Sequence, residues 1–592
     1  MMLAVTTIVS ATLGGSSAAW AVEDTTSPTS PIKNVIILIP DGMANDATAL
    51  ARWYKGSSLT LDSMASGMVR THSADAPIAD SAPAGTAFAT GHKSHTGYVG
   101  VLPDKATMPG QKAIAPGDAK KPVASILEAS RLAGKATGII ATSEIMHATP
   151  ADFSAHYPDR KNYDALSKQQ VYNGMDVVLG GGSSYLEPAG RKDGENLVSS
   201  IKALGYDYVT TPAAMKASTS GKLWGMFAPA GMAYNMDRDP AKQPSLAEMT
   251  SKAIEVLSKD EDGFFLMVEG SKVDWAAHAN DPIGIISDVL AFDDAVKVAM
   301  DFAKKDKETV VVAVTDHQNG GLTIGNASTT GTYDKEPLST FIGPLKKAKL
   351  TGEGVESKLN AKRTNIKAVM KQYYGISDLT SEEIAAIKAA SPGSLNYTVG
   401  PMISKRSGIG WTTGGHTGGD VVLYTYAPNN DRPFGVIDNT DVAKYMARVL
   451  DLDLDNVSKQ LFVPAKQAFT AKGATLNWIT LRVRDLEASL RFYHGMLGLP
   501  IERRFESRGR QIAMLGPENE TKLELIEGSD TLLKPDSGVS IGYEVRSLDE
   551  VMEQLAALGI PIARGPVQPN PYLRFIYITD PDGFEVQLAE HI

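Results

Sequence analysis

Residue types that hold metal ions or take part in catalysis follow several apolar runs of this sequence. The runs are VIILIP at 35–40, TGIIAT at 137–142, FFLMV at 264–268 and VVVAVT at 310–315. The residues after them carry carboxylates, imidazoles or a hydroxyl: Asp41, His147, Thr149, Glu269, Asp316 and His317. In an open α/β sheet, ligands bind outside the carboxyl ends of the strands, so these side chains are expected at one edge. A single such residue is usually a turn former or a helix cap, but four strands that each deliver one indicate a site.

Two further patterns supply metal-binding side chains. Asp274 and His278 lie four residues apart in VEGSKVDWAAHAND, which places both on one face of a helix and in reach of one ion. His416 lies in TTGGHTGG, whose glycines let the backbone approach a site closely. A surface Asp/His pair and a solvated loop histidine are the alternatives. Because the chain has no cysteine, any metal ion must be held by histidines and carboxylates.

Five motifs in order resemble the alkaline phosphatase family across about residues 32–454. In chain order they are PDGM, ADSAPAGTAFATG, EGSKVDWAAH, TDHQNGGL and GGHTGGD. The second motif contains Ser81, which looks like the family's nucleophile, and HYPDRKNY contains Arg160, which matches the family's phosphate-binding arginine. The resemblance implies a metal-dependent phosphomonoesterase of broad substrate range that passes through a phosphoserine intermediate and forms a homodimer.

The resemblance also implies three metal sites. One zinc ion would be held by Asp274, His278 and His416. A second zinc ion would be held by Asp41, Asp316 and His317, together with Ser81. A third site, for magnesium, would use Asp41, Thr149 and Glu269, with His147 as a further candidate. His147 stands where some members have Asp, and Trp275 where some have Lys; an imidazole makes the third site softer, so zinc or cobalt are alternatives to magnesium there.

The chemistry of Ser81 agrees with this resemblance. An unassisted serine hydroxyl is a poor nucleophile at neutral pH, and coordination to zinc favours its alkoxide. The small residues after Ser81 predict a helix, whose first backbone N–H groups favour a phosphoryl group. Two metal ions about 4 Å apart clamp the attacking and leaving oxygens of an in-line displacement. Arg160 could grip two non-bridging oxygens, a geometry that lysine cannot copy.

Three other functions compete with this interpretation. A sulfatase signature runs Cys or Ser, x, Pro, x, Arg; Ser81 and Pro83 fit it, but Gly85 stands where the arginine belongs. A phosphodiesterase of the same superfamily is the stronger alternative, and Arg160 argues against it because two gripped oxygens suit a dianionic monoester. A secreted phosphate- or metal-binding protein would need the nucleophile or a ligand to be lost, and none is.

The elements that must position these residues follow from the apolar runs. Continuous β-branched runs, including VVLYTYA at 421–427, alternate with helical patterns and predict a doubly wound, mostly parallel α/β sheet over residues 32–454. Between residues 326 and 405 the alternation lapses into a Gly-, Thr- and Lys-rich stretch. We expect an inserted, crown-like cap there, with one helix near 381–390.

An internal repeat marks a second domain over residues 474–592. VRDLEASLRFYHGMLGLPI begins at Val483 and VRSLDEVMEQLAALGIPI at Val545, 62 residues later. The repeat predicts an α+β domain of two βαβββ units and, with DPDGFEVQL, resembles the glyoxalase/bleomycin resistance (vicinal oxygen chelate) family. The four metal positions of that family fall on Trp478, Glu524, Ser540 and Gln587. Since Glu524 alone could hold a divalent ion, we expect a metal-free binding or pairing module, with a fusion that has no function in this chain as the alternative.

Composition and the first residues limit the partners and the location. The net charge is −10, with no Lys/Arg run, so neither a specific nucleic-acid partner nor a polybasic membrane anchor is expected. Residues 1–21 predict a signal peptide, because a short apolar run reaches the sequence AWA at 19–21. The run is too short to span a membrane. We therefore expect a secreted or periplasmic protein; a buried apolar helix is the alternative reading of this segment.

Overall fold

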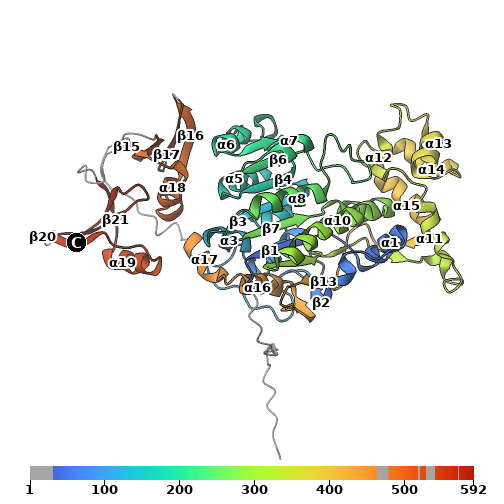
Figure 1. Cartoon of the computed structure of the whole chain (residues 1–592), viewed down its shortest axis with the longest axis horizontal. Helices are drawn as coiled ribbons and strands as arrows, with labels where there is room; N and C mark the ends of the chain where they lie inside the picture. The colour runs from blue at the N-terminus through green and yellow to red at the C-terminus, as the bar shows by residue number, and fades with distance from the viewer. Residues whose placement is uncertain (1–30, 463–477, 508, 518–519, 529–539, 571) are drawn as a thin grey trace, which may run out of the picture. The chain divides into compact units, whose positions relative to one another are not determined.

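The computed structural model describes residues 31–462, 478–507, 509–517, 520–528, 540–570 and 572–592 (Figure 1). The signal peptide expected over residues 1–21 lies outside the described residues. Among the helices that the structure describes, none has the length and apolar character needed to cross a membrane.

A ten-stranded sheet forms the centre of the larger domain. Its order is β14 (Gly435–Asp438), β2 (Ala65–Arg70), β13 (Val421–Tyr426), β8 (Thr309–Val314), β1 (Asn34–Ile39), β7 (Phe264–Glu269), β3 (Ala136–Glu144), β4 (Val177–Gly181), β6 (Leu223–Met226) and β5 (Asp207–Val209). All neighbours are parallel except at β13, which runs antiparallel to both β2 and β8. The five apolar runs of the sequence are strands of this sheet, so the predicted mostly parallel α/β fold is confirmed.

Helices cover both faces of the sheet, which explains the continuous apolar runs. In β1, Ile36 and Leu38 pack into one hydrophobic cluster, and Val35, Ile37 and Ile39 into another. The first cluster includes buried side chains of α8 (Leu246–Leu257) and α10 (Pro282–Asp306). The second includes those of α2 (Ser81–Thr90), α3 (Ile126–Leu132) and α16 (Asn439–Val449). A strand that is buried on both faces has no polar positions to alternate with apolar ones.

The insertion between residues 326 and 405 is more helical than the sequence indicated. A helix was expected near 381–390 and is present as α14 (Ser381–Ala389). The segment also contains α11 (Leu338–Leu345), α12 (Gly352–Glu356), α13 (Ile366–Val369) and α15 (Asn396–Arg406). These helices are short or contain a proline, Pro344 in α11 and Pro401 in α15, so they lack a clear 3.6-residue pattern. The buried carboxylate of Asp281 ties the insertion to α10, because it accepts hydrogen bonds from Gly352 N at 2.8 Å and Tyr374 Oη at 2.9 Å.

The C-terminal domain contains the two expected βαβββ units. The first has β15 (Trp478–Val483), α18 (Leu486–Leu490), β16 (Ile501–Ser507), β17 (Arg510–Leu515) and β18 (Lys522–Glu527), in the sheet order β15-β18-β17-β16. The second has β19 (Ser540–Glu544), α19 (Leu548–Ala557), β20 (Arg564–Asn570), β21 (Leu573–Thr579) and β22 (Glu585–His591), in the matching order β19-β22-β21-β20. Both units contribute to one hydrophobic cluster. The buried Tyr493 hydroxyl donates to Asp580 Oδ2 at 2.7 Å, which joins the first unit to the second.

Candidate active site

Three neighbouring strands deliver carboxylates and an imidazole to one edge of the sheet. Asp41 follows β1, Glu269 ends β7, and Asp316 and His317 follow β8. The strands lie in the order β8-β1-β7 and run parallel, so their carboxyl ends coincide. All four side chains are fully buried. Burial of three carboxylates together is costly unless a cation or a proton compensates them.

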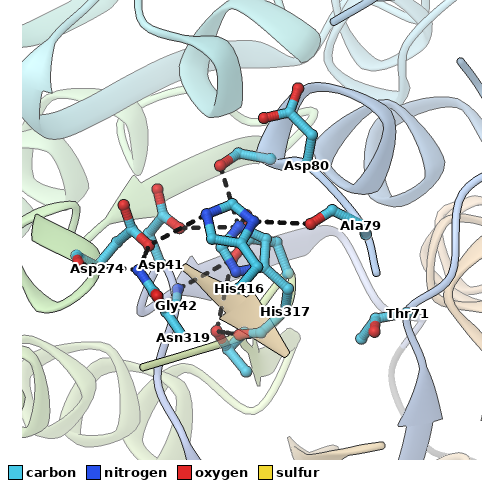
Figure 2. A network of polar contacts seen from close by, with 12 residues as sticks. Asp41, Gly42, Thr71, Ala79, Asp80, Asp274, His317, Asn319 and His416 are labelled. Carbon is cyan, nitrogen blue, oxygen red and sulfur yellow. Dashed lines mark hydrogen bonds and ion pairs between the residues drawn. The ribbon is translucent and has the colours of Figure 1, made fainter. Parts of the chain in front are cut away.

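A glycine allows the loop after β1 to approach a neighbouring helix. Gly42 has φ of 67°, and a Cβ atom at this position would lie 2.5 Å from Oδ1 of Asp274 in α9 (Lys272–His278). The same loop is fixed by its amides, because Gly42 N donates to Asp316 Oδ1 at 3.2 Å and Met43 N donates to Thr315 Oγ1 at 3.0 Å. The loop therefore holds Asp41 between the β8 residues and Asp274 (Figure 2).

Ser81 is the first residue of α2 and lies at the same edge. Its hydroxyl is almost fully buried, and Oγ is 3.1 Å from Nε2 of His317. Asp80 is the N-cap of α2. A hydroxyl at the first turn of a ten-residue helix lies beside unpaired backbone N–H groups, which attract an anion.

Two histidines from outside the sheet lie near Asp274, and their ring orientations are fixed by the backbone. The Nδ1 atoms of His278 and His416 lie 2.8 Å from the carbonyl oxygens of Gly414 and Ala79. Because these Nδ1 atoms face carbonyl acceptors, each ring presents Nε2 as the free ligand atom. Residue His416 is held beside the β8 loop by the short antiparallel pairing of β12 (His416–Thr417) with β9 (Gln318–Asn319).

Within the described residues, three groups of side chains have ligand atoms within 4.8 Å of one another. They are Asp274, His317 and His416; Asp41, Asp316 and His317; and Asp41, His147 and Glu269. Groups one and two share His317, and groups two and three share Asp41, so the three lie side by side. His278, which the resemblance placed with Asp274 and His416, is not in the first group; its Nε2 atom is 3.4 Å from Asp274 Oδ2.

Unpaired buried atoms show that these residues fit metal ions. The atoms without a hydrogen-bond partner include Asp41 Oδ1 and Oδ2, Glu269 Oε1, Asp316 Oδ2, Thr149 Oγ1 and His147 Nδ1. Buried polar atoms rarely stay unpaired, and a cation would satisfy these donors of electron pairs together. Thr149 lies in the first turn of α4 (Ala148–Asp152), and His147 is the N-cap of that helix. Oxygen and nitrogen ligands of this kind suit zinc, magnesium or cobalt.

Burial and neighbouring charges shift the pKa values of the site side chains. Burial, followed by the charge of Asp316, raises the pKa of Asp41 well above its usual range. Burial raises the pKa of Glu269 to about 8. Burial alone would also raise the pKa of Asp274, but its hydrogen bond with His278 lowers it overall. Burial and the neighbouring Arg160 guanidinium lower the pKa of His147 to about 3, so its imidazole is neutral.

Arg160 lies between Asp80, the neighbour of Ser81, and His147 of the third group. Its Nη1 atom donates to Asp80 Oδ1, and its Nη2 atom is 3.1 Å from His147 Nε2. The backbone amide of Arg160 donates to Gly97 O at 2.8 Å, which fixes the loop that carries it. The guanidinium is thus held beside Asp80, the residue that precedes α2.

Two site residues were not identified from the sequence. Asn319 Nδ2 donates to Asp274 Oδ1 at 2.6 Å and so orients a candidate ligand. Ser143 Oγ donates to Glu269 Oε2 at 3.3 Å. Asn319 lies within TDHQNGGL, which could have suggested a role, whereas no pattern around Ser143 indicates one.

Comparisons with known proteins identify the families to which the two parts of the chain are similar. Residues 32–452 match the family model described as Alkaline phosphatase, and residues 475–588 match that of the Glyoxalase/Bleomycin resistance protein/Dioxygenase superfamily. Alkaline phosphatase 4 of Bacillus subtilis is 40% identical over 439 residues, which cover 71% of this chain and 89% of the relative. The crystal structure of a cold-active alkaline phosphatase from Shewanella sp. matches with a TM-score of 0.62 at 30% identity, over 70% of this chain and 99% of that one.

A further solved structure contains a bound metal ion. It is a His-to-Asp mutant of the alkaline phosphatase from the Antarctic bacterium TAB5, with Mg bound in its M3 site. It matches with a TM-score of 0.51 at 26% identity, over 72% of this chain and 99% of that one. From the family model and the curated relatives, the chain belongs to the alkaline phosphatase family and is an enzyme that hydrolyses phosphate monoesters.

Proposed function

We propose that the chain hydrolyses phosphate monoesters of broad structure through a phosphoserine at Ser81. The observation that carries this proposal is the position of Ser81 Oγ, buried at the start of α2 and 3.1 Å from His317 Nε2. Ser81 Oγ would lose its proton to solvent and form a bond to phosphorus while the bond to the ester oxygen breaks, and the leaving alkoxide would take a proton from solvent to become the alcohol. Water would then break the Ser81–phosphorus bond and release inorganic phosphate.

The metal ligands are assigned as the resemblance implies, with support from the unpaired buried atoms. One zinc ion would use Asp274, His278 and His416, a second Asp41, Asp316 and His317 with Ser81, and the third ion Asp41, Thr149, Glu269 and His147. When bound, these ions favour the serine alkoxide and stabilise the charge on the attacking and leaving oxygens. The neutral imidazole of His147 has one nitrogen with a lone pair, so it would hold the ion through its unpaired Nδ1 atom with the proton on Nε2. Because one ligand is an imidazole, zinc or cobalt competes with magnesium at the third site.

Arg160 would favour substrates whose phosphate group carries two negative charges. Asp80 holds Nη1 and His147 lies near Nη2, so the guanidinium is oriented before a substrate binds. A fixed guanidinium can donate two hydrogen bonds to the non-bridging oxygens of a dianionic monoester. A phosphodiester has only one negative charge, so it would gain less from this contact.

Replacement of Arg160 by Ala tests the preference for monoesters over diesters. We expect kcat/KM for a chromogenic monoester to fall at least about a hundredfold, and inhibition by phosphate to weaken, since a bidentate charged contact is lost. Turnover of a chromogenic diester should change far less. Equal losses for both esters would favour the alternative, a phosphodiesterase. Metal analysis of the same purified wild-type protein should find two zinc ions and a third ion per chain. Hydrolysis of the monoester by that metal-loaded protein would distinguish an enzyme from a phosphate- or metal-binding protein.

We further propose that the protein is secreted or periplasmic and forms a homodimer. Export is supported by the AWA sequence at 19–21, and the dimer by the family resemblance. Sedimentation of the purified chain would test the dimer, and activity in the culture medium or periplasm would test export.

The C-terminal domain is proposed to be a metal-free binding or pairing module. Among the four positions where its relatives place metal ligands, Glu524 has the only carboxylate, and its Oε2 atom accepts a hydrogen bond from Thr480 Oγ1 at 2.6 Å. Gln587 lies in β22, opposite Gly542. The side chains of Trp478 and Ser540 lie outside the described part of the structure. Stoichiometric metal in purified residues 474–592 would contradict this proposal.

A further inference from the structure

A buried lysine lies next to the candidate site without being one of its proposed ligands. Lys272 opens α9, two residues before Asp274, and only 1% of it is exposed. Its Nζ atom lies 4.3 Å from the ring centroid of Tyr234 and 4.1 Å from that of Trp275. Both distances are those of cation–π contacts, which are strongest where water is excluded.

The ammonium group is also paired with the inserted cap. Nζ of Lys272 is 3.4 Å from Oε2 of Glu353 in α12. Burial lowers the pKa of Lys272, and the carboxylates of Glu353, Asp288 and Glu144 oppose this shift. A buried cation is retained only where such partners offset its desolvation. The rings and carboxylates around Lys272 therefore stabilise its ammonium group in the interior.

Trp275 lies in contact with both Lys272 and the third group of side chains, through His147. The two residues lie three positions apart on α9, so they share a face of the helix. The Trp275 ring packs so closely on Gly231 that a Cβ atom there would overlap it. The ring also meets His147 edge-on, with centroids 6.2 Å apart. His147 in turn contacts Arg160, whose other nitrogen is held by Asp80.

We propose that Lys272 is a positioning residue for phosphate binding, which acts through Trp275 and His147 on the guanidinium of Arg160. Lys272 touches neither the nucleophile nor a proposed metal ligand through its ammonium group. Its charge holds the indole in one orientation, the indole restrains the imidazole, and the imidazole restrains one side of the guanidinium. Through Glu353, the inserted cap takes part in this restraint. The inference rests on the proposed function, since it assigns Arg160 to phosphate.

The test compares three lysine variants in the full-length, metal-loaded enzyme. Lys272→Met removes the charge and should raise both the KM for a chromogenic monoester and the inhibition constant of inorganic phosphate about three- to tenfold. Lys272→Arg keeps a cation between the rings and should stay within about twofold of wild type. Lys252→Met is the matched control: Lys252 is also buried and donates to Ser218 O at 2.6 Å, but it lies on α8 away from these contacts, so no change is expected.

The Lys272→Met substitution in a chain that already carries Arg160→Ala distinguishes a positioning role of Lys272 from a general loss of structure. If Lys272 acts through Arg160, Lys272→Met should change phosphate inhibition less than about twofold in a chain that already carries Arg160→Ala. The same rise in both backgrounds, or no rise in a folded and active Lys272→Met enzyme, would overturn the inference. A wild-type chain without monoesterase activity would instead overturn the proposed function.

A milder variant covers the case in which Lys272→Met does not fold. Glu353→Gln removes only the carboxylate partner, and its side chain is 44% exposed, so the fold should tolerate it. We expect phosphate inhibition to weaken about twofold or more, again only when Arg160 is present. Unchanged inhibition in Glu353→Gln together with an unfolded Lys272→Met would leave Lys272 a purely structural residue and refute its positioning role.

Discussion

At the scale of single residues, Ser81 differs from the other members of the site. Asp41, Asp316 and His317 form a ligand-distance group without it, whereas Ser81 Oγ contacts this group only through His317 Nε2. The framework for the metal ions should therefore survive the loss of the hydroxyl.

Replacement of Ser81 by Ala is expected to lower monoester kcat by more than about a thousandfold, because the nucleophile is lost. The metal content should stay that of wild type. Metal analysis and steady-state kinetics on the same preparation would check both parts. Unchanged turnover would mean that another group attacks phosphorus.

His147 offers a second change at the same scale. A carboxylate in place of this imidazole would harden the ligand set of Asp41, Thr149 and Glu269, so His147→Asp should bind more magnesium at the third site and respond more strongly to added magnesium. Bound magnesium and zinc per chain, measured by mass spectrometry, provide the readout. If neither form responds to magnesium, the assignment of the third site is wrong.

At the scale of elements, a buried ion pair supports the loop that carries Arg160. Nε2 of His156 is 2.9 Å from Oε1 of Glu128 in α3, and its Nδ1 atom is 2.7 Å from Gly100 O. Burial lowers the pKa of His156, but the Glu128 carboxylate raises it overall above the usual 6.5. Burial likewise raises the pKa of Glu128, and His156 lowers it overall below the usual 4.5.

The pair should make stability depend on pH. The contribution of His156 is fully present below about pH 6.5 and is lost as the pH rises through its higher folded-state pKa. The contribution of Glu128 is present above about pH 4.5 and is lost as the pH falls. We expect His156→Gln to lower the free energy of unfolding by about 2–4 kcal/mol at pH 6 and by less at pH 9. A difference in melting temperature that grows towards pH 9 would contradict the ion pair.

Some of the strands could be predicted from the sequence and others could not. β1, β7 and β8 are buried on both faces, so their β-branched runs are continuous and easy to recognise. β4 and β6 are short and contain glycine, and β5 has three residues, so none of them shows a pattern. Residues directly after the recognisable strands were identified as site candidates. Asn319, Ser143 and the Lys272 contacts depend on packing between distant segments, which no local pattern reports.

At the scale of the whole molecule, each of the two domains has its own hydrophobic core. The large sheet is packed between two hydrophobic clusters, and a third cluster contains only residues between Leu481 and Leu588. All three ligand-distance groups are made by residues between Asp41 and His416. The candidate catalytic residues and the core that supports them therefore belong to the larger domain.

This separation makes a clear prediction for a chain that ends near Lys472. We expect such a chain to bind its metal ions and to hydrolyse a chromogenic monoester with kcat/KM within about twofold of the full chain, because no proposed ligand or catalytic residue is removed. If the C-terminal domain is a pairing module, sedimentation should show a different assembly state at the same concentration. If it is a binding module, assembly should be unchanged and residues 474–592 should fold alone with their own cooperative transition, since they have their own core. Loss of metal ions or of activity in the shortened chain would contradict the separation, because it would mean that the second core supports the first.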